Sequence, residues 1–134
     1  AYPQAGNLVP LDVGRGTGHL FYVDAGSISR GEDGVMRYTA DIKAAGGAMN
    51  VSFEGMRCET RERKVYAFRR PDGTWVRARD PGWTRVAYTD AAPHQGMLFR
   101  DYFCPSRFHL PRPQDVVTAL KRGEPVNPAT QMRE

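Results

Sequence analysis

No apolar run of about 18 residues occurs in the sequence, so we expect no membrane-spanning helix. The first residues carry no charged and then apolar leader, although Ala1 could be the residue that follows a removed signal peptide. None of the histidines has a Cys, Asp, Glu or His partner at metal-ligand spacing; they are His19, His94 and His109. We therefore expect no metal ion and no cofactor.

Patterns typical of catalysis are also missing. Gly14, Gly16 and Gly18 lack the GxGxxG spacing of a dinucleotide loop, and a strand-like segment follows them. No serine lies in a nucleophile-elbow context, which applies to Ser27, Ser29, Ser52 and Ser106. The acidic residues are scattered, and no pair suited to acid–base work stands out. The sequence therefore predicts a protein that is not an enzyme.

The chain has only two cysteines, and they are its most informative residues. Cys58 and Cys104 each lie in an aromatic, half-apolar segment that should be buried. A lone pair so placed predicts one structural disulfide, which would stabilise the fold by about 4 kcal/mol in the chain-entropy model. A disulfide favours an oxidising compartment, such as a cell envelope. The alternative is a reactive thiol with His94 as its base.

The net charge is +4, the isoelectric point is about 9.3, and arginine dominates residues 57–85. The planar guanidinium group of arginine matches the geometry of carboxylate and phosphate groups. Tryptophan and arginine are also favoured at interfaces. The candidate binding residues are Arg61, Arg63, Arg69, Trp75, Arg77 and Arg79. One alternative is a sheet face that is charged only for solubility. Another is a polyanion-binding or nucleic-acid-binding protein that stacks bases on interleaved aromatic residues, although no RNA-recognition signature occurs.

Strand patterns occupy the first two thirds of the chain. Residues 35–43 alternate, so Met36, Tyr38, Ala40 and Ile42 should share one face, and residues 49–53 should pair with them as a hairpin. Residues 57–69 are expected to continue as one long strand with a bend or bulge. After the turn signal at residues 71–73, residues 74–79 should return as its partner.

Helix patterns come last. Asp90 could cap a helix that ends near Phe103, and Pro113 and Gly123 mark the limits of a second helix. This order predicts an α+β fold, in which a meandering antiparallel β-sheet carries one or two C-terminal helices on one face. The expected organisation is an extended arm over residues 1–18, a single domain over 19–123 and a disordered tail over 124–134.

Several blocks in a fixed order resemble the cryptic-neisserial-protein-like family over roughly residues 8–122. They are residues 21–29, 34–39, 50–58, 64–67, 72–75 and 98–105. The resemblance implies a small exported protein of Gram-negative bacteria, made with a signal peptide or lipoprotein leader and of uncharacterised function. The order of an early aromatic strand, a mid-chain Cys and a late Tyr-x-Cys is also similar to surface-adhesin protein E domains. We expect an envelope module that binds a protein or an anionic surface through the arginine-rich sheet face.

Overall fold

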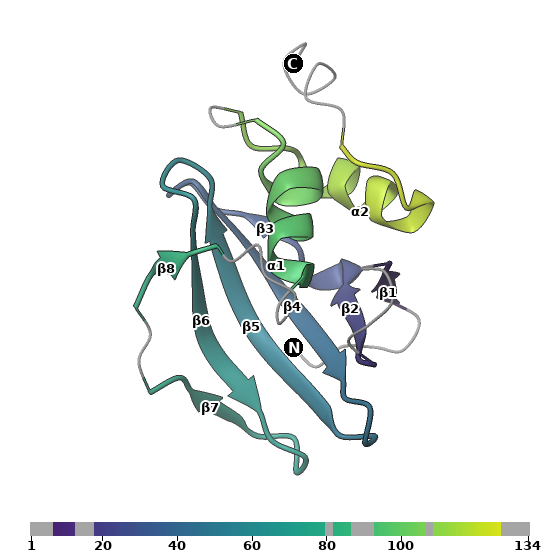
Figure 1. Ribbon diagram of the computed structural model, residues 1–134. Coiled ribbons are helices and arrows are strands. Elements are labelled where there is room, and N and C mark those ends of the chain that lie inside the picture. Colours follow the sequence, from purple (N-terminus) through teal and green to yellow (C-terminus); the bar gives the residue numbers. More distant parts are fainter. Residues whose placement is uncertain (1–6, 13–17, 80–81, 87–92, 107–108, 127–134) are drawn as a thin grey trace.

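An antiparallel sheet of eight strands forms the body of the protein in this computed structural model (Figure 1). The structure describes residues 7–12, 18–79, 82–86, 93–106 and 109–126. Strands follow the order β1-β2-β4-β5-β6-β7, while β3 pairs with β4 and β8 pairs with β6. Their bounds are β1 Leu8–Leu11, β2 Leu20–Asp24, β3 Ser29–Arg30, β4 Val35–Lys43, β5 Met49–Arg57, β6 Glu62–Arg69, β7 Trp75–Arg77 and β8 Thr84–Arg85.

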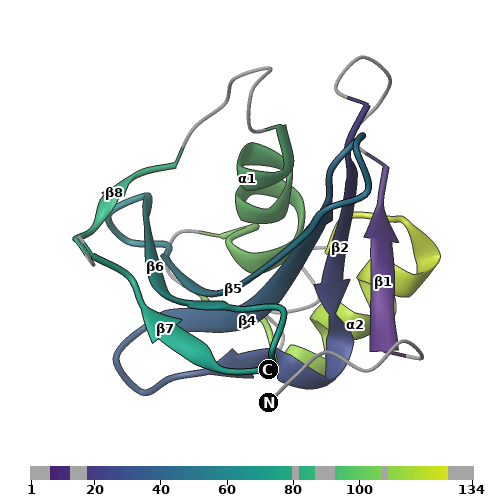
Figure 2. The same ribbon diagram turned by 90° about the horizontal axis from the view of Figure 1, so that it is seen from below.

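The helices lie on one side of this sheet, which curves around α1 (Figure 2). Helix α1 (Pro93–Met97) continues into η3 (Leu98–Phe103), a wider π-helical turn, and α2 (Pro113–Arg122) follows. Gly123 ends α2 in the left-handed conformation with φ of 67°, as its sequence position predicts. The α+β fold with helices on one sheet face is therefore confirmed.

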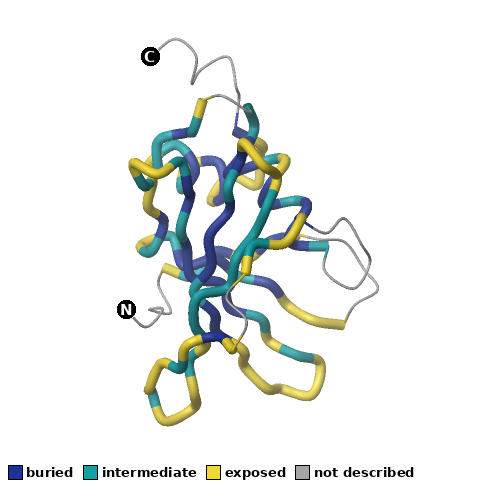
Figure 3. The backbone as a smooth tube through the Cα atoms, turned by 90° about the vertical axis from the view of Figure 1, so that its left-hand side faces the viewer, coloured by how far each residue is buried: buried dark blue, intermediate teal, exposed yellow. Residues whose placement is uncertain are grey.

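The core lies between the sheet and the helices. Met36 and Tyr38 of β4 are fully buried, and the Tyr38 ring stacks on Phe103 with 4.5 Å between centroids. Val116 and Leu120 of α2 are buried in the same cluster. Figure 3 shows the contrast between buried strand centres and exposed hairpin ends. The alternation of β4 thus predicts its core face correctly.

The predicted disulfide is present. Cys58 directly follows β5, Cys104 directly follows η3, and their Cα atoms are 5.3 Å apart. Both residues are buried, and neither cysteine is free. The bridge therefore joins the end of a central strand to the helical layer, and it leaves no thiol for the reactive-cysteine alternative.

Three boundaries differ from the expectations. Residues 57–69 do not form one strand, because a turn separates β5 from β6. In this turn the Arg61 N–H donates to the Cys58 carbonyl at 3.4 Å, and Arg61 has a φ of 58°. The sheet begins within the segment expected as an arm, since β1 pairs with β2. In the expected tail, the N–H of buried Val126 donates to the Asp101 carbonyl at 2.8 Å. The expected cap at Asp90 lies outside the described residues.

Candidate functional site

The two faces of the sheet have different surroundings. Directly opposed residues of antiparallel strands share a face, so the strand register assigns each side chain. Met36 and its partner Met56 mark the face that packs on the helices, here called the helix face. Arg37 and its partner Gly55 mark the other side, here called the open face.

Part of the predicted binding set lies together on the open face. Trp75 is opposite Arg69, and Arg77 is opposite Ala67. Ala67 in turn pairs with Phe53, which is in the same alternating row as the open-face residues of β5. Arg69, Trp75 and Arg77 therefore present their side chains on one surface at the edge of the sheet.

The remaining candidates do not lie beside these three residues on the open face. Arg63 is opposite Met56 on the helix face, and its Nε donates to Glu54 Oε1 at 3.1 Å. Arg61 lies in the turn before β6, and Arg79 follows the end of β7. Arg63 is thus a structural partner of a buried carboxylate.

A β-bulge explains why Arg63 is separated from the others. Val65 is opposite Glu54, whereas Ala67 is opposite the next residue, Phe53, so Tyr66 is an extra residue in β6. One extra residue reverses the alternation of a strand. Arginines on either side of the bulge consequently lie on opposite faces, although an even number of positions separates them.

The open face also holds a cluster of cations and aromatic rings that the candidate set did not include. The Lys64 Nζ lies 5.2 Å from the Tyr66 ring centroid and 5.8 Å from that of Trp83. Arg37 lies 5.5 Å from Tyr66, and Arg57 lies 4.0 Å from Trp83. We call these five residues the cation–aromatic cluster. In the sequence, Lys64 and Tyr66 are only two residues apart. Arg37, Arg57 and Trp83 come close to them only through the pairing of the strands.

Ion pairing on the open face is incomplete. Arg37 pairs with Asp33 at 2.7 Å, and Arg57 pairs with Glu62 at 3.5 Å. Other open-face cations have no carboxylate within 4.0 Å among the described residues; they are Lys43, Lys64, Arg77 and Arg85. This surface therefore has a positive excess that the fold itself does not neutralise.

A shallow groove crosses the open face next to Trp75. Its volume is 450 Å³, and it is lined by Asp24, Gly26, Ser27, Thr39, Phe53, Ala67 and Trp75. The floor comes from β4, β5 and β6, while the turn η2 (Ala25–Ser27) and strand β7 contribute the two sides. The groove combines the aromatic side chains of Phe53 and Trp75 with adjacent cations, which is a composition suited to binding.

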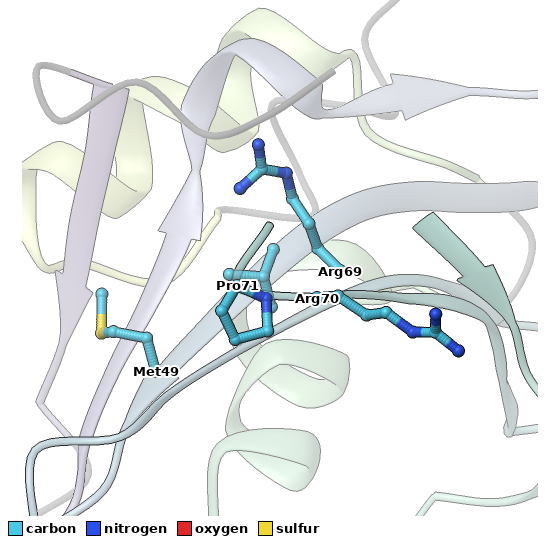
Figure 4. A pocket seen from close by; sticks show the side chains of 5 residues that line it. Met49, Arg69, Arg70 and Pro71 are labelled. Carbon is cyan, nitrogen blue, oxygen red and sulfur yellow. The ribbon is translucent and has the colours of Figure 1, made fainter. Parts of the chain in front are cut away.

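A second hollow of 260 Å³ lies at the β6–β7 hairpin. It is lined by Met49, Val51, Arg69, Arg70 and Pro71. Figure 4 shows the guanidinium groups of Arg69 and Arg70 pointing in different directions. A single small anion could not lie between both groups in this arrangement, so the hollow is not an arginine clamp.

A buried polar network lies on the helix face and belongs to the structure. Glu54 accepts hydrogen bonds from Tyr38 Oη at 3.1 Å and from Ser52 Oγ at 2.5 Å, in addition to the bond from Arg63. Burial raises the pKa of Tyr38 well above its usual value of 10.0. The network is satisfied internally, which is what a buried carboxylate requires.

His94 of α1 borders this network. Its ring stacks on Phe21 with 4.6 Å between centroids, and its Nδ1 has no hydrogen-bond partner among the described residues. Burial lowers the pKa of His94 below 6.5; the nearby Glu54 carboxylate opposes this shift and Arg63 adds to it. A neutral imidazole packed on a phenyl ring is a core residue here, not a base poised beside a thiol.

The described residues contain neither a membrane-spanning helix nor a metal-binding group. No helix among the described residues is long and apolar enough to cross a membrane. The same residues contain no group of three or more His, Cys, Asp or Glu side chains arranged to hold a metal ion.

Comparison with known proteins places the chain in a family. The model of the CNP1-like family matches residues 1–121. No curated protein and no solved structure matched the chain, so the similarity to surface-adhesin protein E domains finds no support there. Because the match covers most of the sequence, the protein belongs to the CNP1-like family.

Proposed function

We propose that the protein is a non-enzymatic module of the bacterial cell envelope, periplasmic or attached to the outer envelope, that binds an anionic partner through its open face. The partner is a protein or another anionic surface. The observation that carries this proposal is the uneven use of charge. On the helix face, Arg63 forms an ion pair with Glu54 within the fold. On the open face, Lys64 and Arg77 have no carboxylate partner among the described residues.

The location is supported by two independent features. Cys58 and Cys104 form a disulfide, and such bonds persist mainly in oxidising compartments. The sequence blocks shared with the cryptic-neisserial-protein-like family imply an exported protein. Fractionation of the native host tests this: the oxidised protein should appear in the periplasmic or envelope fraction, and recovery of a reduced form from the cytoplasm would contradict it.

A binding role is favoured over catalysis by where the titratable groups lie. The Glu54 network is closed off beneath α1 with its hydrogen bonds satisfied. The groove on the open face has one carboxylate in its lining, Asp24, and that group caps the turn by accepting from the Gly26 N–H at 3.0 Å. Neither place offers the convergent, poised groups of an active site.

Nucleic-acid binding is the second candidate, because aromatic rings and cations alternate on this face. The rings in question, Tyr66 and Trp83, already carry Arg37, Lys64 and Arg57 over them. Such rings offer less free surface for stacked bases. Protein carboxylates need only the cations, so they fit the observed arrangement better.

The proposal can be tested with a matched pair of double variants. Lys64→Ser/Arg77→Ser removes two charges from the open face, and Lys121→Ser/Arg122→Ser removes two exposed charges from the end of α2. Binding to poly-L-glutamate, to vesicles containing anionic lipid and to single-stranded DNA is measured over a range of salt concentrations. We expect the open-face variant to bind poly-L-glutamate about fivefold more weakly and the α2 variant to change little.

Two results would overturn the proposal. Equal losses in both variants would mean that binding follows net charge and not the open face. Binding confined to single-stranded DNA, with a steep fall as salt rises, would favour the nucleic-acid alternative.

A further inference from the structure

The groove beside Trp75 has a rigid polar wall whose hydrogen-bonding groups are largely in use. Ser27 Oγ donates to the Asp24 carbonyl at 2.7 Å and accepts from the Thr39 N–H at 2.7 Å. Asp24 Oδ1 accepts from the Gly26 N–H at 3.0 Å. Hydrogen bonds within the protein therefore hold this wall in place without a ligand. The wall defines the shape of the groove more than it offers hydrogen-bonding groups to a ligand.

The opposite wall is formed by Trp75, and Phe53 and Ala67 make most of the floor apolar beside Thr39. Trp75 is 37 % exposed, which is unusual for so large a ring, and it faces the same groove as Phe53 and Ala67. A partly exposed tryptophan beside a hollow is a typical anchor point of an interface. The volume of 450 Å³ is within the range of sites that enclose a small ligand or a side chain with its backbone. The groove is thus shaped for an apolar group.

Two cations lie near this groove on the same face. Arg77 lies opposite Ala67 of the floor. The Phe53 ring contacts the Tyr66 ring with 5.4 Å between centroids, and Lys64 lies over Tyr66 at 5.2 Å. Asp24 is the only acidic residue in the groove lining, and it is buried and engaged. Charge complementarity therefore favours negative charge beside the apolar group that fills the groove.

We propose that the groove takes one aromatic or aliphatic side chain from an acidic, extended segment of a partner protein, with neighbouring carboxylates of that segment facing Arg77 and Lys64. This inference rests on the proposed function and adds the chemistry of the partner. An anionic membrane or a simple polyanion would use the cations but leave the groove and Trp75 unused. The apolar anchor distinguishes these occupants.

Three blocked peptides provide the probe. The first is Glu-Glu-Phe-Glu-Glu, the second carries Ser in place of Phe, and the third carries Gln in place of every Glu. Each is titrated into the isotope-labelled oxidised protein, and the indole N–H of Trp75 and the backbone amides are followed by NMR. We expect the Phe peptide to bind about tenfold more tightly than the Ser peptide, because its ring leaves water.

Variants decide whether the groove is responsible. Trp75→Ala should abolish the advantage of the Phe peptide and leave the weaker binding of the Ser peptide. The matched control is Phe68→Ala, which removes a ring that is 48 % exposed but opposite Val76, on the helix face of the same sheet edge. This control should retain the advantage of the Phe peptide.

The outcomes separate this inference from the proposed function. Equal binding of the Phe and Ser peptides, with Trp75 unperturbed, would overturn the groove inference while the open-face function stands. Absence of binding by all three peptides at low salt would contradict both. A shift of the Trp75 signal with protein concentration alone would assign the groove to a second copy of the chain and would also overturn the inference.

Discussion

The two faces of the sheet use the same kinds of side chain for different purposes. On the helix face, Arg63 pairs with Glu54 at 3.1 Å, and Arg30 Nη1 donates to the Leu110 carbonyl at 3.2 Å. On the open face, Lys64 and Arg77 have no such partner among the described residues. Arg63 is held by a buried carboxylate, whereas Arg77 is exposed and its charge is available to a ligand. Arginine content alone therefore does not identify a binding face.

The aromatic residues show the same contrast. Tyr38 and Phe103 are fully buried and stack on each other between sheet and helices. Trp75 on the open face is partly exposed at the sheet edge, in β7. The large rings of the helix face are therefore part of the core, whereas Trp75 remains in contact with solvent. Substitutions on each face test this difference.

The largest expected effect comes from removing the disulfide that holds the helical layer. Cys58→Ala/Cys104→Ala opens a loop with a sequence separation of 46, and we expect a loss of about 4 kcal/mol in the free energy of unfolding. Urea denaturation measures this loss. Reduction of the wild-type protein should reproduce it, and two alkylation labels per unfolded chain should appear only after reduction. An unchanged urea midpoint would show that the bridge adds nothing to stability.

The next effect compares a carboxylate on each face. Glu54→Gln removes the charge that Tyr38, Ser52 and Arg63 share, and it should cost about 2 kcal/mol of unfolding free energy. Glu62→Gln removes the partner of Arg57 on the open face, and it should cost less than about 1 kcal/mol. Chemical denaturation of both variants gives the two values. Similar costs would mean that the faces do not differ as described.

A smaller effect should appear as a pH dependence of the helix face. Because burial lowers the pKa of His94 below 6.5 in the folded state, the unfolded state binds more protons as the pH falls through 6.5. Stability should therefore be fully present above that pH and decline below it. His94→Phe keeps a ring to stack on Phe21 and should flatten the decline, as measured by urea midpoints across this range. His109→Phe, at an exposed position, is the control and should keep it.

The smallest effect on stability is expected on the open face. Lys64→Ser/Arg77→Ser should change the free energy of unfolding by less than about 1 kcal/mol, since both side chains are solvated and only Lys64 lies over aromatic rings. Calorimetry measures this change, while the same variant is expected to lose binding. A loss comparable to that of Glu54→Gln would mean that these cations have a structural role.

Local patterns in the sequence predicted much of the fold. The alternation of β4 identified the core residues Met36 and Tyr38, and the Pro113 and Gly123 signals placed α2 at its observed ends. The presence of only two cysteines, each in an apolar segment, predicted the Cys58–Cys104 disulfide. Each of these features depends on a residue's own neighbours or on a single pairing, and for this reason each could be read without the structure.

The candidate site was predicted less well because it depends on strand pairing. Arg63 and Arg69 would share a face if a strict period of two applied to β6, but the extra residue Tyr66 reverses that period. The sequence predicted a bend or bulge within residues 57–69, but it did not identify Tyr66 as the extra residue. The contacts of Lys64 and Arg57 with Trp83 join β5, β6 and the segment before β8, and no local pattern contains them.

The bulge in β6 also has an evolutionary consequence. Since Tyr66 shifts the phase of the strand, it determines which positions of β6 after the bulge face the helices and which face solvent. In other members of the CNP1-like family, changes at Arg63 should be accompanied by changes at Glu54, because each satisfies the other. Residues facing outward beyond the bulge are free to diverge together with whatever they contact. One inserted residue thus decides which positions of the strand are under the constraint of the core.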